Sequence, residues 1–115
     1  MLEFEAYQVS NAVEKTLMTD HKPNKHDRYV EQLVRQIQDD YDSISTYMTL
    51  ERRKRLVGEI DVVARKGNEL HIYEVKCSYR ITKARKQLAK IKRIFGDTAM
   101  CYFYCGSGNQ IIQVC

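Results

Sequence analysis

The sequence is poor in three residue types, with one proline, five glycines and no tryptophan in 115 residues. This composition excludes a collagen-like or linker-like protein. Uninterrupted apolar runs are only a few residues long, which excludes a transmembrane helix. The N-terminus, MLEFEAYQ, has no basic segment followed by an apolar stretch. We therefore expect no secretory signal and a cytoplasmic protein, including one associated with a nucleoid or one of viral origin acting in a host cell.

What the chain does contain is enough for one ordered domain. Its apolar fraction is 43% and its charged fraction is 30%, which is typical of a globular protein with a core. A length of 115 residues leaves little room for a second domain. We therefore treat residues 1–115 as a single domain.

Cysteine spacing gives no zinc pattern, since the four cysteines form neither a CxxC pair nor a Cys/His set. They fall in or beside expected strands, where free cysteine behaves as a small apolar residue. We interpret them as reduced core residues of an intracellular protein. A disulfide from Cys101 or Cys105 to Cys115 is the alternative if those strands pair.

Charge is small in sum but unevenly placed: 19 basic and 15 acidic residues give a net charge of +4. The segment from Ser78 to Gly96 has basic residues and no acidic ones, and a second basic cluster precedes Leu56. Carboxylates concentrate elsewhere. This distribution favours a polyanionic partner, with a solvated helix face as the alternative. The basic residues are Arg80, Lys83, Arg85, Lys86, Lys90, Lys92 and Arg93, and Arg52, Arg53, Lys54 and Arg55.

Two amphipathic segments come first in the chain. Residues 2–18 have apolar residues at helical spacing, although FEAYQV also has strand propensity. We expect residues 1–24 to form a helical arm or a dimerisation segment. The polar DHKPNK stretch then breaks the chain. Residues 26–40 place Tyr29, Val30, Leu33, Val34 and Ile37 on one face, which predicts a second helix.

After Asp42 the apolar period changes to two, which predicts strands. The expected order is a strand over 44–50, EIDVVAR, a turn at Lys66-Gly67-Asn68, ELHIYEVKC, a helix, TAMCYFYC and QIIQVC. Thr82 is the expected cap of that helix, and Gly96 its stop. A helix between two strands indicates a parallel crossover. The predicted fold is α/β, with a five-stranded mixed sheet flanked by helices.

The residues that indicate chemistry lie on the two strands of the expected hairpin. Glu74 and Lys76 are two residues apart and therefore share a face. The two arms from Gly67 are nearly equal, so the hairpin brings Asp61 close to them. Two carboxylates in apolar surroundings need a counter-ion. Mg²⁺ (or Mn²⁺) meets that need, with the Val75 backbone carbonyl as a further ligand. The alternative is a structural salt-bridge cluster with Lys76 and Arg65.

Gly58-Glu59-Ile60-Asp61, a 12-residue gap and Glu74-Val75-Lys76 together resemble the core motif of the PD-(D/E)XK nuclease superfamily. Ile60 stands where that motif has proline. Within the superfamily, GEIDVVARKGNELHIYEVK is similar to UPF0102 (YraN-like) proteins, and the element order resembles archaeal Holliday junction resolvases. The resemblance implies a restriction-endonuclease-like core. It covers residues 57–77 closely and the flanks only in element order.

The resemblance also implies further site residues. In these families a helical glutamate completes the metal site, and Glu31 is the best candidate, with Glu14 as the fallback. A glutamine on the following helix often lies near the site, and Gln87 is the one present there. We interpret the three histidines, His21, His26 and His71, as surface or strand residues rather than ligands.

These observations predict a metal-dependent endonuclease that hydrolyses DNA phosphodiesters, with Asp61, Glu74, Lys76 and Glu31 as catalytic residues. The two basic clusters and Gln87 are the expected nucleic-acid contacts. No base-reading motif is present, so branched or structured DNA, such as a Holliday junction, is the expected substrate. Cutting a junction needs two active sites and hence a homodimer. The alternatives are a non-catalytic nucleic-acid-binding module and a protein-interaction subunit with the same fold.

Overall fold

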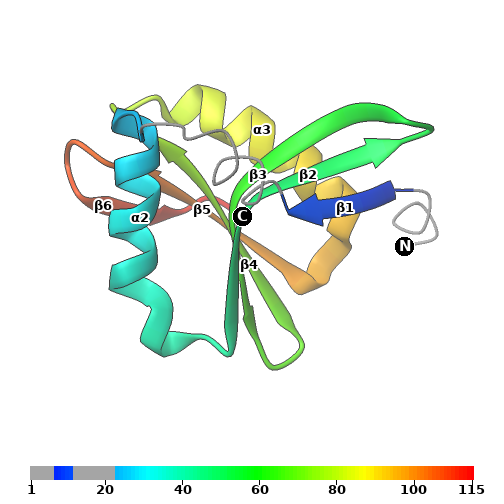
Figure 1. The fold of residues 1–115 in the computed structure, drawn as a ribbon, viewed down its shortest axis with the longest axis horizontal. Coiled ribbons are helices and arrows are strands. Elements are labelled where there is room, and N and C mark those ends of the chain that lie inside the picture. Colours follow the sequence, from blue (N-terminus) through cyan, green and yellow to red (C-terminus); the bar gives the residue numbers. More distant parts are fainter. Residues whose placement is uncertain (1–6, 12–22) are drawn as a thin grey trace.

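A computed structural model of the chain describes residues 7–11 and 23–115. These residues form strands and two α-helices, together with short 3-10 helices at Gln38–Asp40 and Gly96–Thr98. Figure 1 shows the arrangement. In order, they are β1 (Tyr7–Asn11), α2 (Lys25–Ile37), β2 (Ser43–Arg52), β3 (Arg55–Lys66), β4 (Glu69–Lys76), α3 (Ile81–Phe95), β5 (Ala99–Cys105) and β6 (Gln110–Gln113).

The strands form one mixed sheet in the order β1-β2-β3-β4-β5-β6. Every neighbouring pair is antiparallel except β4 and β5, which run parallel and are joined through α3. The predicted α/β class, the five strands after Asp42 and the parallel crossover are therefore confirmed. The β3–β4 turn has its positive φ at Gly67, where a residue without a Cβ is favoured.

The expected N-terminal helix is wrong for the part of that segment that the structure describes. Tyr7–Asn11 is strand β1, paired antiparallel with β2 from Tyr7 opposite Arg52 to Asn11 opposite Met48. The outer edge of β2 offers backbone groups that need partners, and pairing them outweighs a weak helical period. Residues 1–6 and 12–22, with Glu14 and His21, lie outside the described residues, and so does most of the predicted arm.

Helix boundaries differ in detail from the predicted ones. Helix α2 ends at Ile37 rather than at residue 40. Helix α3 begins at Ile81, so its N-cap is Arg80, and Thr82 lies within the first turn instead of capping it. Gly96 ends α3 with a φ of 80°, as its lack of a Cβ predicts.

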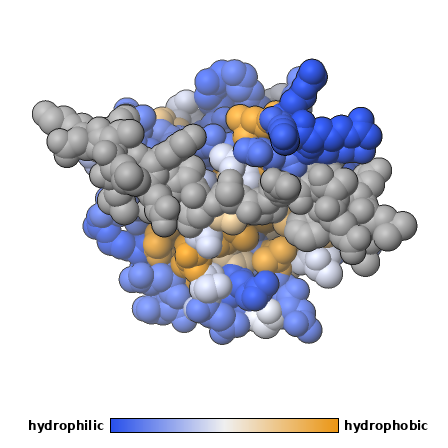
Figure 2. All heavy atoms as spheres, turned by 45° about the vertical axis from the view of Figure 1, so that its right-hand side comes forward, coloured by the Kyte–Doolittle hydropathy of each residue, from blue (hydrophilic) through white to orange (hydrophobic). Residues whose placement is uncertain are grey.

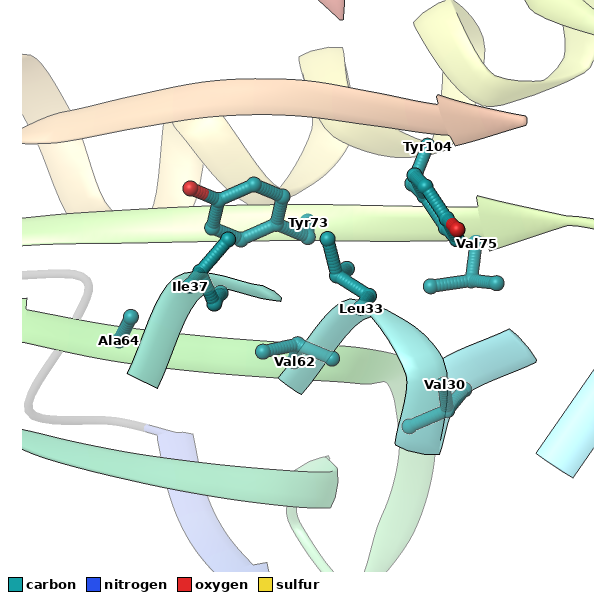
Figure 3. Packing of buried hydrophobic residues seen from close by; sticks show 8 residues of the cluster. All are labelled: Val30, Leu33, Ile37, Val62, Ala64, Tyr73, Val75 and Tyr104. Atoms are coloured by element: carbon teal, nitrogen blue, oxygen red, sulfur yellow. The ribbon is translucent and has the colours of Figure 1, made fainter. Parts of the chain in front are cut away.

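Each helix covers apolar residues on one side of the sheet. On one side, Val30, Leu33 and Ile37 of α2 pack over side chains from β3, β4 and β5, as Figure 3 shows. The sheet residues of that cluster are Val62, Ala64, Tyr73, Val75 and Tyr104. On the other side, Leu88, Ile91 and Ile94 of α3 pack with Leu50, Ile60, Ile72, Ala99 and Cys101. All four cysteines are free thiols, as expected, but only Cys101 and Cys105 are core residues, since Cys77 is half-buried and Cys115 is exposed.

Candidate metal centre at the fork of the sheet

Strands β3 and β4 separate at the point where the chemistry-bearing residues lie. Their ladder runs from the turn to the pair Val62–Tyr73. Beyond that pair β3 continues only with β2, while β4 continues with β5 as far as Lys76. Figure 1 shows the resulting fork, with the β2–β3 hairpin diverging from β4. Asp61 and Glu74 are the first residues past the ladder on each strand.

The fork brings Asp61, Val75 and the Glu74–Lys76 pair together, as the equal arm lengths predict. The Val75 backbone N–H donates to Asp61 Oδ2 at 2.9 Å. Lys76 Nζ lies 3.2 Å from Glu74 Oε2, so these two side chains do share a face. Asp61 and Glu74 are each only 6% exposed. Arg65, the other cation of the salt-bridge alternative, is exposed and paired with Leu70 near the β3–β4 turn.

The electrostatics of this pair are unfavourable without a cation. Burial of the Glu74 carboxyl and, after it, the neighbouring Asp61 charge raise the pKa of Glu74 to about 7. Lys76 acts in the opposite direction but does not cancel these effects. Burial penalises the charged form, and two like charges side by side penalise it again. Burial and the Asp61 charge together therefore favour the neutral form of the Glu74 carboxyl.

His26 is the site residue that sequence reasoning missed. Its Nε2 lies 3.3 Å from Asp61 Oδ2 and 3.0 Å from the Val75 carbonyl oxygen. The hydrogen bond to Asp61 raises the pKa of His26 above its ordinary value, more than burial lowers it. A signal was present in the sequence. His26 precedes Val30, Leu33 and Ile37 by four, seven and eleven residues, so it extends the buried stripe of α2.

The start of α2 is held by a polar set that includes the neighbour of His26. Asn24 and Asp27 form a capping box, with Asp27 N donating to Asn24 Oδ1 at 2.8 Å and Asn24 N donating to Asp27 Oδ2 at 3.2 Å. Tyr47 O–H donates to Asp27 Oδ1 at 2.6 Å. Tyr47 has a φ of 53°, an unusual value for a bulky residue in a strand. The first turn of α2, with His26, is thereby tied to β2.

Along β3, the regular alternation of side chains between the two faces of the sheet is interrupted at Asp61. Ile60 packs in the cluster under α3, whereas Val62 packs in the cluster under α2. On β2, Thr46 pairs with Val62 and Met48 pairs with Ile60, so Tyr47 is the residue between them and Asp61 its counterpart. A positive φ at Tyr47 and a broken alternation at Asp61 coincide, which is typical of the strained positions that recur at functional sites.

The structure does not bring Glu31 to the cluster. Glu31 is exposed on α2, and its Oε1 lies 2.6 Å from Nη2 of Arg35, one helical turn away. The prediction that Glu31 joins the metal ligands is therefore unsupported. The rotation of α2 about its axis explains this, because the buried stripe presents His26 to the fork instead. Gln87 lies on the exposed part of α3.

The predicted nucleic-acid contacts form two exposed sets. Arg52, Arg53, Lys54 and Arg55 make the tip of the β2–β3 hairpin, where Arg53 and Lys54 have positive φ. Figure 2 shows strongly hydrophilic side chains projecting at the upper right, the side on which this hairpin lies in Figure 1. On α3 the basic residues are exposed except Lys92, whose Nζ donates to the Ala99 carbonyl. Lys92 thus has a structural role in joining α3 to β5.

The donor atoms at the fork fit a divalent cation. Asp61 and Glu74 supply carboxylate oxygens, and Val75 supplies a carbonyl oxygen that already faces a positively polarised N–H. Among residues 7–11 and 23–115, no three His, Cys, Asp or Glu side chains are gathered as a ready-made metal cluster. The two carboxylates and the Val75 carbonyl are thus donors that lie near one another without forming a complete ligand set.

Comparison with models of known protein families finds no match, and no curated protein matches the chain. The resemblance to PD-(D/E)XK nucleases thus depends on the motif residues alone. In the part of the chain that the structure describes, no helix is long and apolar enough to cross a membrane.

Proposed function

We propose that this protein is a metal-dependent, structure-selective endonuclease that hydrolyses DNA phosphodiester bonds with Mg²⁺ or Mn²⁺. The observation that carries the proposal is the pair of buried carboxylates, Asp61 and Glu74, with Lys76 beside them at the fork. Buried like charges are costly, and a chain that needed only a stable sheet would gain by replacing them. Perturbed carboxyls of this kind cluster at functional sites.

Each residue has a distinct role in this proposal. Asp61, Glu74 and the Val75 carbonyl would hold the cation. The chemistry that it would supply when bound is that of a Lewis acid, namely a lower pKa of a water and neutralised charge on the phosphate. Lys76, with its ammonium 3.2 Å from Glu74, donates hydrogen bonds to the oxygen of the attacking water and to the phosphoryl oxygens on which negative charge develops. The apolar clusters on both sides of the sheet exclude bulk water from the floor of the site.

The two basic sets flank the fork and supply phosphate contacts. The hairpin tip Arg52–Arg55 and the exposed lysines and arginines of α3 carry charge without a base-reading element. Such contacts are independent of sequence and weaken steeply with salt. Selectivity then comes from DNA shape, and a branched substrate cut on two strands would be held by a homodimer.

The test is cleavage of a panel of end-labelled substrates at one salt concentration: a four-way junction, a flap, a single strand and a plain duplex. We expect nicking in Mg²⁺ or Mn²⁺ and none in EDTA, with the branched substrates cut fastest. Asp61→Asn abolishes cleavage, and the matched control Asp97→Asn, an exposed acid in the turn after α3, does not. Binding of DNA without cleavage in either metal would refute the nuclease and favour a non-catalytic binding module.

The phosphate contacts have a separate test in the salt dependence of binding. Replacing Arg53 and Lys54 by alanine should weaken binding of every substrate alike. It should also flatten the plot of log affinity against log salt by about one unit for each phosphate that is no longer neutralised. Lys66→Ala, at the end of β3 beside the β3–β4 turn, is the matched control. An unchanged slope in the double variant would remove the hairpin tip from the DNA interface.

A further inference from the structure

We propose that His26 is a nitrogen ligand of the divalent cation at the fork, and that it gives the site a preference for Mn²⁺ over Mg²⁺. The proposal rests on the metal site of the proposed function but adds a residue and a metal selectivity to it. It replaces Glu31 as the contribution of the helix.

The first observation is a convergence of donor atoms. His26 Nε2 lies 3.0 Å from the Val75 carbonyl oxygen and 3.3 Å from Asp61 Oδ2. In the metal-free molecule one polarised N–H is thus directed at two oxygens that are themselves suited to a cation. When Nε2 carries no proton, its lone pair is directed into the same space. The nitrogen and both oxygens therefore point toward the same space from opposite sides, and this space is the proposed cation position.

The second observation is the support behind the imidazole. The other ring nitrogen, Nδ1, lies 4.0 Å from Asp27 Oδ1. Asp27 is in turn fixed by Tyr47 and by the Asn24 capping box. A histidine that binds a metal commonly turns its second nitrogen toward a carboxylate, which sets the tautomer and raises the basicity of the ligating nitrogen. At 4.0 Å the Asp27 carboxylate is too far for a hydrogen bond to Nδ1, but it places negative charge on that side of the ring.

The helix that carries His26 is seated firmly against the sheet. Val30, Leu33 and Ile37 are buried on the same stripe. The ring of Tyr29 lies so close to Gly106 that a Cβ there would come within 2.2 Å of it. The first turns of α2 therefore cannot rotate by one residue without breaking these contacts, so Glu31 stays in its exposed pair with Arg35.

Metal preference follows from the ligand types. Mg²⁺ takes oxygen ligands almost exclusively, whereas imidazole nitrogen suits first-row transition metals. A site of two carboxylates, one carbonyl and one imidazole therefore favours Mn²⁺ over Mg²⁺ more strongly than the same site with a third carboxylate. The substitution His26→Glu makes that change at one position.

The experiment measures metal binding on the whole protein without substrate. Calorimetric titration with MnCl₂ and with MgCl₂ gives the ratio of the two affinities, and pulsed EPR of bound Mn²⁺ detects nitrogen within its first shell. We expect ¹⁴N coupling in the wild type that changes to ¹⁵N coupling when the protein is labelled with ¹⁵N-histidine. His26→Ala should lose the coupling and weaken Mn²⁺ binding by at least the roughly 10- to 100-fold that is typical when a partner behind a metal ligand is lost. His26→Glu should lose it while lowering the Mn²⁺/Mg²⁺ ratio.

The controls separate this inference from the proposed function. His71→Gln, which removes the other described imidazole, should keep the ¹⁴N coupling. Mn²⁺ binding with no nitrogen coupling, and with equal Mn²⁺/Mg²⁺ ratios in the wild type and His26→Glu, would overturn the role of His26 even if DNA cleavage is observed. Nitrogen coupling that disappears in His26→Ala would support it even if every DNA substrate is left intact, an outcome that would count against the nuclease alone.

Discussion

The two ends of the β3–β4 hairpin differ in how well the hydrogen bonds and charges around them stabilise their buried polar groups. At the fork, Asp61 and Glu74 are both acidic and both buried, and burial together with the neighbouring Asp61 charge raises the pKa of Glu74 to about 7. Near the turn, Tyr41 hydrogen-bonds His71 Nδ1 at 2.6 Å and Tyr73 at 2.6 Å, and His71 Nε2 contacts Glu69 at 3.2 Å.

The second set, which we call the tyrosine–histidine network, consists of Tyr41, Glu69, His71 and Tyr73. Its hydroxyl and imidazole groups satisfy one another, and Tyr102 stacks on Tyr73 with ring centroids 4.9 Å apart. Satisfied polar networks rigidify a fold, whereas uncompensated charge lowers stability. The same hairpin is thus optimised for folding at one end and carries a stability cost at the other. We expect substitutions at the two ends to separate activity from stability.

Among substitutions that leave Asp61 in place, the largest effect should come from Lys76→Met at the fork. Removing one donor to a developing charge costs about 10²- to 10³-fold in rate. Because Lys76 is the only cation in direct contact with Glu74 among the described residues, we expect a loss of that size in junction cleavage. Circular dichroism should show an unchanged fold. Wild-type cleavage by Lys76→Met would show that the lysine only balances charge.

The next effect should be on stability, from His71→Ala in the tyrosine–histidine network. It empties a buried position and leaves the Tyr41 hydroxyl without its imidazole partner. We expect a loss of about 2 to 3 kcal/mol in the free energy of unfolding, measured with urea. Cleavage per folded molecule should be unchanged, and a large loss of activity would break the comparison.

A smaller effect of opposite sign should come from Glu74→Gln without divalent cations. The change removes one of two buried like charges, so we expect stabilisation of about 1 to 2 kcal/mol at pH 8. The pKa of Glu74 is higher in the folded protein, about 7, than its ordinary 4.5. The carboxyl therefore costs nothing below pH 4.5, its cost grows as the pH rises from 4.5 to about 7, and the cost is constant above that. The gain should vanish in denaturation curves recorded near pH 4.5.

The smallest effect should come from Tyr41→Phe, which removes a single hydroxyl from the tyrosine–histidine network. Tyr73 and His71 keep other neighbours, so we expect a loss of about 1 kcal/mol, seen as a modest drop in Tm. Cleavage and Mn²⁺ binding should match the wild type. A gain in stability would mean that the network is strained rather than satisfied.

The β3–β4 hairpin was predictable because its information is local. Alternation, the Lys66-Gly67-Asn68 turn and the equal arms place Asp61 beside Glu74 with no knowledge of the rest of the chain. The contribution of α2 was not predictable in the same way. Whether Glu31 or His26 faces the fork depends on how Tyr29 and Leu33 seat the helix on distant strands. Strand β1 was missed for a related reason, since its partner β2 lies some 40 residues along the chain.

The parallel pairing of β4 with β5 gives the fork one rigid wall. The ladder from Leu70 to Lys76 is unbroken on that side, and Gly106 N extends it by donating to the Lys76 carbonyl at 2.8 Å. Past Tyr73, no strand that the structure describes pairs with the other edge of β4, because β3 turns away with β2. Strand β4 is thus held along nearly its whole length by β5, whereas β3 beyond Val62 is held in the sheet by β2 alone. Glu74 and Lys76 therefore lie on the more fully paired side of the fork, and the basic tip lies on the less fully paired arm.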